Sequence, residues 1–158
     1  MTLEIALSRG LVALVDDADV QRILAAAPWH AYPSGDTFYA RHSITPSRQI
    51  TLHAFLTGWA FVDHVNRDGL DNRRENLRPA TNSQNQMNAR MHSNNTSGFK
   101  GVQRCGRLTW KAHIKLDSRR LHLGTFDTPQ EAAHAYDEAA AHYFGEFARP
   151  NFPESVSR

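Results

Sequence analysis

Cysteine is nearly absent from this sequence, because Cys105 is the single thiol among 158 residues. One cysteine cannot form an internal disulfide, and it excludes a cysteine-rich zinc site. Apolar runs are also short, and none approaches the ~20 residues that a membrane helix needs. The N-terminal residues include Glu4 and lack a basic patch before an apolar stretch, so we expect no secretory signal and an intracellular protein.

The remaining composition is that of an ordinary folded protein. Hydrophobic residues make up 41% of the chain and charged residues 22%, which excludes a fully disordered chain. A chain of this length forms one ordinary domain or two small ones.

The net charge of +2 conceals a segregation of charge along the chain. Residues 1–77 carry seven basic against nine acidic side chains, whereas residues 78–124 carry nine basic side chains against Asp117 alone. Residues 125–158 carry two basic against six acidic side chains. A basic block that contains Trp110 is typical of a surface for a phosphate backbone, although the same charges also serve solubility alone.

Turn-forming residues divide the first half of the chain into short elements. Alternating apolar residues over 3–15 predict a hairpin, and the acidic start of residues 16–27 predicts a short helix. Residues 29–40 predict a second strand pair around a Pro-Ser-Gly-Asp turn, and residues 50–55 predict a strand or a short buried element. Because residues 1–50 carry no chemical pattern, we interpret them as a small scaffold sheet.

The middle of the chain predicts the order strand, loop, strand, helix. Residues 61–62 are a short apolar strand end, residues 66–72 are rich in turn formers, and residues 76–78 are extended again. Pro79 discourages further pairing, and a helix is predicted from residue 81 or 82 to about residue 91.

The last part of the chain predicts a separate module. Residues 93–97 are polar and lack periodicity, which indicates a linker. Thr128-Pro129-Gln130-Glu131 is a capping box that begins a helix ending near Phe144. Three alternating segments predict an antiparallel three-stranded sheet before this helix, at residues 99–105, 109–116 and 120–126.

Asp63, His64 and Asn85 form a combination with a clear chemical meaning. Asp63 and His64 are adjacent at a strand end, and Asn85 follows in a predicted helix. Their carboxylate and amide oxygens suit a hard divalent cation, if the helix folds back over the strand. His64 faces away from Asp63, because strand side chains alternate, and its imidazole is suited to accept a proton from water. This layout favours phosphodiester hydrolysis.

Residues 62–78, with the sequence VDHVNRDGLDNRRENLR, resemble the core of the HNH endonuclease family in its phage homing-endonuclease branch. The resemblance implies a ββα-metal fold in which Asp63 and Asn85 are metal ligands and His64 is the general base. It implies that Asn76 supports the loop through hydrogen bonds to the backbone. It also implies one Mg²⁺ or Mn²⁺ ion per active site, and cleavage that leaves 5′-phosphate and 3′-hydroxyl ends.

Two other features lie close to this motif. Leu52-His53 stands where relatives often have Leu-His-Arg, but Ala54 takes the place of the arginine, and we interpret His53 as structural. Residues 64–75 also resemble the calcium loop of a calcium hand. However, that loop would begin with His64 instead of aspartate, and a strand is predicted where a calcium hand requires a helix.

Residues 98–153 resemble the DNA-binding domain of plant ethylene-response factors (the APETALA/ERF type). The matching pieces include SGFKGV at 97–102 and LGTFDTPQEAAHAYDEAA at 123–140. That family docks its three-stranded sheet in the DNA major groove, with the helix behind it as support. Trp110 either packs under the sheet or contacts DNA, and we favour packing. The positions that match DNA-contacting residues are Lys100, Gln103, Arg104, Arg107, Lys115, Arg120 and His122.

The sequence therefore predicts an α+β protein. Its parts are a scaffold at 1–50, a ββα-metal nuclease core at 51–92, the linker at 93–97 and an ERF-type domain at 98–153. We expect a metal-dependent endonuclease that cuts double-stranded DNA at a preferred site in the cytoplasm of a bacterial or phage-infected cell. We expect a monomer or homodimer without membrane association. The alternatives are a DNA-binding regulator with an inactive nuclease core, and a nuclease for RNA or structured DNA.

Overall fold

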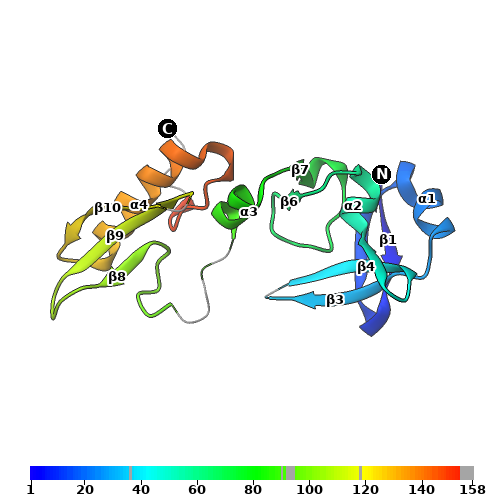
Figure 1. Cartoon of the computed structure of the whole chain (residues 1–158), viewed down its shortest axis with the longest axis horizontal. Helices are drawn as coiled ribbons and strands as arrows, with labels where there is room; N and C mark the ends of the chain where they lie inside the picture. Colours follow the sequence, from blue (N-terminus) through cyan, green and yellow to red (C-terminus); the bar gives the residue numbers. More distant parts are fainter. Residues whose placement is uncertain (36, 90, 92–94, 118, 154–158) are drawn as a thin grey trace. The chain divides into compact units, whose positions relative to one another are not determined.

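The chain folds into two compact units, residues 1–82 and 83–158, and its architecture is α+β with small antiparallel sheets. Figure 1 shows the computed structural model coloured along the sequence.

Part of the predicted linker at 93–97 lies outside the described residues. In the part of the chain that the structure describes, no helix is long and apolar enough to cross a membrane. The structure describes all residues except 36, 90, 92–94, 118 and 154–158.

Two antiparallel sheets form the scaffold of the first unit. The hairpin predicted over 3–15 is confirmed as the pair β1 and β2. The strand pair predicted over 29–40 is confirmed as β3 and β4, and β5 joins the other edge of β4. The elements are β1 (Thr2–Ala6), β2 (Val12–Asp16), α1 (Val20–Ala25), β3 (His30–Ser34), β4 (Thr37–Thr45) and β5 (Arg48–Thr51).

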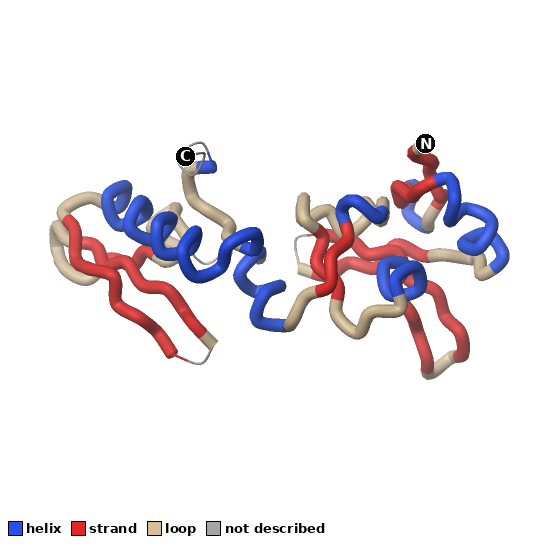
Figure 2. Tube along the Cα trace, turned by 90° about the horizontal axis from the view of Figure 1, so that it is seen from above, coloured by secondary structure: helices blue, strands red, loops and turns tan. Residues whose placement is uncertain are grey.

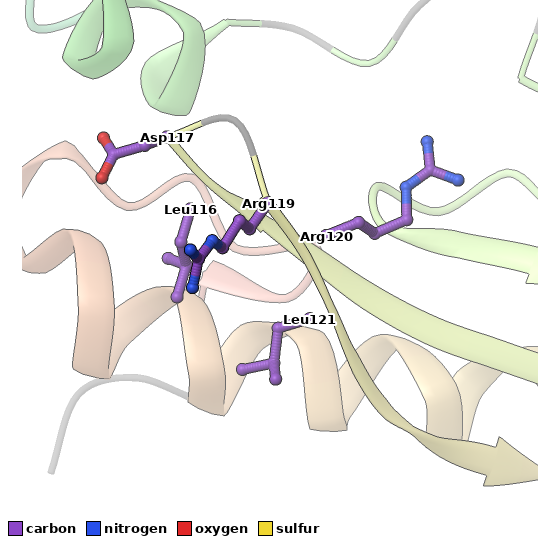
Figure 3. Close-up of a pocket in the computed structure, with 5 residues that line it drawn as sticks. All are labelled: Leu116, Asp117, Arg119, Arg120 and Leu121. Atoms are coloured by element: carbon purple, nitrogen blue, oxygen red, sulfur yellow. The ribbon is translucent and has the colours of Figure 1, made fainter.

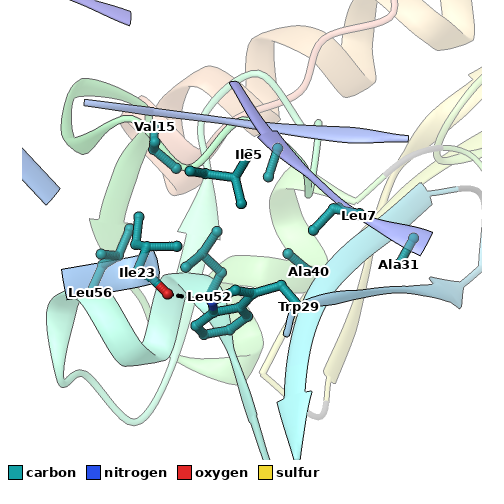
Figure 4. Close-up of a cluster of buried hydrophobic side chains, with 10 residues drawn as sticks. Ile5, Leu7, Val15, Ile23, Trp29, Ala31, Ala40, Leu52 and Leu56 are labelled. Atoms are coloured by element: carbon teal, nitrogen blue, oxygen red, sulfur yellow. Dashed lines mark hydrogen bonds between the residues drawn. The ribbon is translucent and has the colours of Figure 1, made fainter. Parts of the chain in front are cut away.

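A hydrophobic core holds these elements together. Val15, Ile23 and Leu52 are fully buried and come from three different parts of the unit. The indole Nε1 of Trp29 donates a hydrogen bond of 3.0 Å to the backbone oxygen of Ile23, so that the ring closes one side of the core (Figure 4). Burial of each such side chain contributes about 1.5–3 kcal/mol. The core therefore stabilises the unit that carries Asp63 and His64.

Residues 50–55 were expected to form a strand or a short buried element, and the structure shows the end of β5 followed by a short, partly buried helix. Residues Leu52–Thr57 form the helix α2, which places Leu52 and Leu56 in the core. A short apolar run does not distinguish a strand from a helix, because both bury the same residue types. The helix ends at Gly58, whose φ of 71° lies in the left-handed region that glycine adopts readily.

The elements that follow have the predicted order strand, loop, strand, helix. They are β6 (Val62–His64), β7 (Leu77–Pro79) and α3 (Asn82–Asn88), and β6 pairs antiparallel with β7. Pro79 is the last residue of β7 and stands opposite Val62, so the strand ends at the proline as expected. The intervening loop is tied to β2, since the N–H of Asn72 donates a 2.7 Å hydrogen bond to the oxygen of Leu14.

In the second unit a three-stranded antiparallel sheet packs against one long helix, as predicted (Figure 2). The helix begins at the predicted capping box, where Thr128 and Glu131 exchange side-chain to backbone hydrogen bonds. Ala132 and Ala133 are fully buried, so the helix lies close to the sheet. The elements are β8 (Val102–Arg104), β9 (Trp110–Leu116), β10 (Arg119–Phe126) and α4 (Pro129–Phe144).

Gly101 and Gly98 provide a matched test of this packing. Both have a positive φ, 76° and 77°, but a Cβ at Gly101 would lie 2.0 Å from the Tyr136 ring, and nothing lies within 4 Å of one at Gly98. We expect Gly98→Ala to lower the free energy of unfolding by about 1 kcal/mol through backbone strain, and Gly101→Ala by about 2–4 kcal/mol because overpacking is added. Thermal unfolding measures both, and equal losses would contradict the packing.

Candidate active site and nucleic-acid interface

Two adjacent residues of β6 carry the predicted chemistry of the first unit. Asp63 stands opposite Arg78 and His64 stands opposite Leu77 in the pair with β7. Consecutive strand residues point to opposite faces, so the carboxylate and the imidazole leave β6 on different sides. Both residues are buried, with 7% and 5% of their surface exposed.

Asp63 is held in an ion pair across the two strands. Arg78 donates hydrogen bonds from Nε and Nη2 to Oδ2 of Asp63, at 2.9 and 2.7 Å. The side chains of Arg78 and Asp63 are only 14% and 9% exposed, so the pair is largely removed from water. The two hydrogen bonds from one guanidinium converge on the same carboxylate oxygen and restrict the orientation of the carboxylate.

His64 lies in a cluster of aromatic rings. The ring centroids of Tyr39 and His53 lie 5.6 and 5.1 Å from that of His64. Burial lowers the pKa of the His64 imidazole, and it outweighs the opposing effects of the Asn72 side chain and the charge of Asp63. A neutral imidazole accepts a proton, which is the state that a general base requires.

Asn76 ties together the loop between β6 and β7. Its Oδ1 accepts a 2.9 Å hydrogen bond from the backbone N–H of Asn66, and its Nδ2 donates a 2.7 Å hydrogen bond to the backbone oxygen of Asp71. The side chain of Asn66 also donates to the Asp71 carboxylate at 2.8 Å, and the Arg73 guanidinium lowers the pKa of that carboxyl. This is the geometry that a loop-supporting role requires.

Sequence reasoning missed Tyr39, Asn72 and Arg78, which help to build this site. Asn72 is 1% exposed, and its side chain opposes the lowering of the His64 pKa. Tyr39 lies against Gly69, where a Cβ would come within 2.6 Å of the tyrosine ring, so only glycine permits this contact. Asn72 and Arg78 lie inside the motif at residues 62–78, and this position was the signal that could have identified them. No feature of the sequence pointed to Tyr39.

The atoms predicted to hold a metal ion are oxygens. Asp63 offers a carboxylate, and Asn85, in α3, offers a side-chain amide. Within the described residues, no group of three or more His, Cys, Asp or Glu side chains is placed to share an ion. Mg²⁺ is often held by few protein oxygens together with substrate phosphate and water, so the donor chemistry fits it. A calcium hand is excluded, because β6 occupies the place of its first helix.

The sheet of the second unit presents a basic face away from α4. Ala112 and Ile114 of β9 are buried in the clusters that α4 covers, so the alternate residues of β9 point to the other side. Cross-strand partners share a face, which extends this surface to both neighbouring strands. Its residues are Gln103 on β8, Lys111, His113 and Lys115 on β9, and Arg120 and His122 on β10.

Neighbouring positive charges on this basic face affect the pKa of one of its histidines. Burial, together with the neighbouring charges of Arg120 and His122, lowers the pKa of His113. An open pocket of about 540 Å³ lies at the end of the β9–β10 hairpin. Figure 3 shows that Leu121 in this pocket points towards α4, whereas Arg120 points to the opposite side. The pocket is lined by Leu116, Asp117, Arg119, Arg120 and Leu121.

Three residues predicted to contact DNA lie elsewhere. Arg104 is paired with Trp110, and its guanidinium donates to the backbone oxygens of Gly106 and Arg107. Trp110 packs against the core of the unit, which confirms the packing interpretation. Arg107 itself lies between β8 and β9. Lys100 precedes β8, and its ammonium group is bonded to the C-terminal end of α3.

The position of His53 beside His64 predicts a pH-dependent stability. Burial, with a smaller contribution from His64, lowers the pKa of His53 from 6.5 to about 3. Because the unfolded chain then binds the proton more readily, the first unit loses stability as the pH falls from about 6.5 towards 3, by at most a few kcal/mol. Thermal unfolding between these pH values measures the loss, and His53→Gln is expected to reduce it, while His64, whose pKa is also lowered, supplies the remainder. An unchanged pH dependence in the variant would exclude His53 as the titrating group.

Known proteins of two kinds match parts of this chain. The model of the HNH endonuclease family matches residues 59–87. An HNH endonuclease of Acanthamoeba polyphaga mimivirus is 35% identical over 91 residues, which are 58% of this chain and 46% of that protein. Dehydration-responsive element-binding protein 2A of Arabidopsis thaliana is 50% identical over 64 residues, which are 39% of this chain and 19% of that protein. An ethylene-responsive transcription factor of Medicago truncatula is 47% identical over 68 residues, which are 42% of this chain and 25% of that protein.

The chain spans less than half the length of each of these curated relatives. The segment that matches the family model includes Asp63, His64, Asn76 and Asn85. These matches confirm the resemblance of one segment to the HNH endonuclease family and of a second segment to plant ethylene-responsive DNA-binding proteins.

Proposed function

We propose that this protein is a metal-dependent endonuclease that hydrolyses phosphodiester bonds of double-stranded DNA at a preferred site. The observation that carries the proposal is the arrangement of β6, where the neutral imidazole of His64 directly follows the ion-paired carboxylate of Asp63. Both residues lie within the segment that matches the HNH endonuclease family. A proton acceptor and a fixed carboxylate on adjacent strand residues suit the attack of water on a phosphodiester.

Each residue of the site has its own role in this proposal. His64 accepts a proton from the attacking water, and the rings of Tyr39 and His53 hold the imidazole in place. Asp63, oriented by Arg78, and Asn85 would hold one Mg²⁺ or Mn²⁺ ion. When bound, such an ion supplies positive charge that stabilises the negative charge developing on the phosphate and the leaving oxygen.

The basic face of the second unit binds the duplex in this proposal. Most of its contacts are to phosphates and few are to base edges, as is usual for protein–DNA interfaces. The resemblance to homing endonucleases further supports 5′-phosphate and 3′-hydroxyl products, and a place of action inside a bacterial or phage-infected cell. A monomer with one site nicks one strand, whereas a symmetric dimer cuts both.

Substitution of His64 tests the assignment of the general base. His64→Gln and His64→Ala are expected to slow DNA cleavage by about 10²–10⁴-fold and to leave DNA affinity unchanged, because a positioned base contributes that factor. The rate is measured on supercoiled plasmid with Mg²⁺, and EDTA gives the metal-free reference.

His30 provides the matched control, because it is an exposed histidine on β3 of the same unit. His30→Gln is expected to cleave at the wild-type rate. Equal rates for wild type and His64→Gln would show that His64 is not the base. Tight DNA binding without cleavage by the wild type would instead support a regulator with an inactive nuclease core.

The salt dependence of DNA binding tests the basic face. If about six phosphates are neutralised, the logarithm of affinity falls with the logarithm of salt concentration with a slope near −5. Lys111→Gln removes one charge from this face and is expected to reduce the slope by about 1. Arg104→Gln is expected to change it little, because that guanidinium is bonded to the backbone. Fluorescence anisotropy measures the slopes, and a wild-type slope near −1 would contradict the interface.

A further inference from the structure

The C-terminal end of α3 is held by a lysine from further along the chain. Lys100 donates hydrogen bonds from its ammonium group to the backbone oxygens of Met87 and Ala89. The last carbonyl groups of a helix have no partners within the helix, and α3 has no basic residue in its own last turn. The ammonium group therefore satisfies these carbonyls and complements the negative end of the helix dipole.

Lys100 is itself fixed to α4 through its main chain. Its backbone N–H donates a 2.6 Å hydrogen bond to Oδ1 of Asn151, and Nδ2 of Asn151 donates to the oxygen of Lys100 at 3.1 Å. Asn151 in turn donates from its backbone N–H and its Nδ2 to Oδ1 of Asp137, at 2.7 and 2.9 Å. Asp137 is a buried residue of α4, 2% exposed. A continuous chain of hydrogen bonds thus joins the end of α3 to the long helix.

Apolar packing follows the same path. Met87 of α3 packs against the cluster that includes Ile114, Tyr136 and Phe144 of the second unit. An isolated helix shorter than about 12 residues is marginal in water. Because α3 has only seven residues, its order depends on such contacts.

These contacts support one proposal, which rests on the proposed function because it takes Asn85 as a metal ligand. We propose that Lys100 is a positioning residue that fixes α3, and with it Asn85, to the DNA-binding module, and that it does not contact DNA itself. The helix that carries this ligand is then structurally part of the unit that binds the duplex. A nuclease fragment that ends before residues 93–97 would therefore lack Lys100, and with it the contact that fixes Asn85.

The experiment compares Lys100→Met, Lys100→Arg and Lys111→Met in the full-length protein. Methionine keeps an apolar stem but lacks the ammonium group, whereas arginine retains the donors. Lys111 is the matched control, because it is an exposed lysine on the basic face of the sheet. Three quantities are measured: hydrogen exchange of the α3 amides, the Mn²⁺ concentration that half-saturates the protein–DNA complex in electron paramagnetic resonance, and the salt slope of DNA affinity.

Lys100→Met is expected to speed hydrogen exchange in α3 about tenfold and to raise the half-saturating Mn²⁺ concentration about three- to tenfold, because two charge-assisted hydrogen bonds are lost. Its salt slope stays at the wild-type value. Lys100→Arg is expected to restore both exchange and Mn²⁺ binding. Lys111→Met is expected to reduce the salt slope by about 1 and to leave exchange and Mn²⁺ binding unchanged.

Other outcomes would overturn the proposal. A reduced salt slope for Lys100→Met with unchanged exchange in α3 would assign Lys100 to DNA contact. Faster exchange with unchanged Mn²⁺ binding would refute the link between Lys100 and the metal ligand. If the wild type binds no Mn²⁺ and His64→Gln cleaves like the wild type, the proposed function fails and the link to a metal fails with it. Hydrogen exchange then still decides separately whether Lys100 holds α3.

Discussion

The ion pair between Asp63 and Arg78 joins β6 to β7, and the arrangement of the candidate site depends on it. Each strand has only three residues, so few backbone hydrogen bonds hold the pair together. Removal of one partner from a buried ion pair costs about 3–5 kcal/mol, because the remaining charge is left uncompensated. The same pairing fixes His64, the next residue of β6, against the rings of Tyr39 and His53. The ion pair therefore orients the carboxylate, and the neighbouring rings position the imidazole on the same short strand.

Elements whose signals are local in the chain were predicted from the sequence. The hairpin over 3–15 follows from alternation, and the start of α4 follows from the capping box at Thr128, since both depend on near neighbours. The helix α2 was not predicted, because its conformation is decided by the burial of Leu52 and Leu56 in a core built from distant segments. The end of β7 at Pro79 was predicted, because the absence of an N–H group on proline is a local signal.

The same distinction applies to the candidate site. Asp63, His64 and Asn76 were named because a motif contains them, and the loop hydrogen bonds of Asn76 depend on contacts within ten residues. Tyr39 has no such signal, because it comes from β4 and reaches His64 only through the folding of the sheet. The surroundings of Lys100 were equally inaccessible, since membership of a basic block does not say which acceptor lies beside the ammonium group.

The basic residues of the second unit differ in what surrounds them in the structure. Within the described residues, Lys111, Lys115 and Arg120 have no carboxylate within ion-pair distance, so no internal ion pair opposes their attraction to a phosphate backbone. Lys100 and Arg104 instead donate to backbone carbonyls. To reach a phosphate, Lys100 would have to leave two carbonyl oxygens at the end of α3, so DNA contact by this lysine would oppose the order of that helix. Different lysines must therefore serve the two purposes: Lys111 and Lys115 attract DNA, and Lys100 keeps α3 ordered.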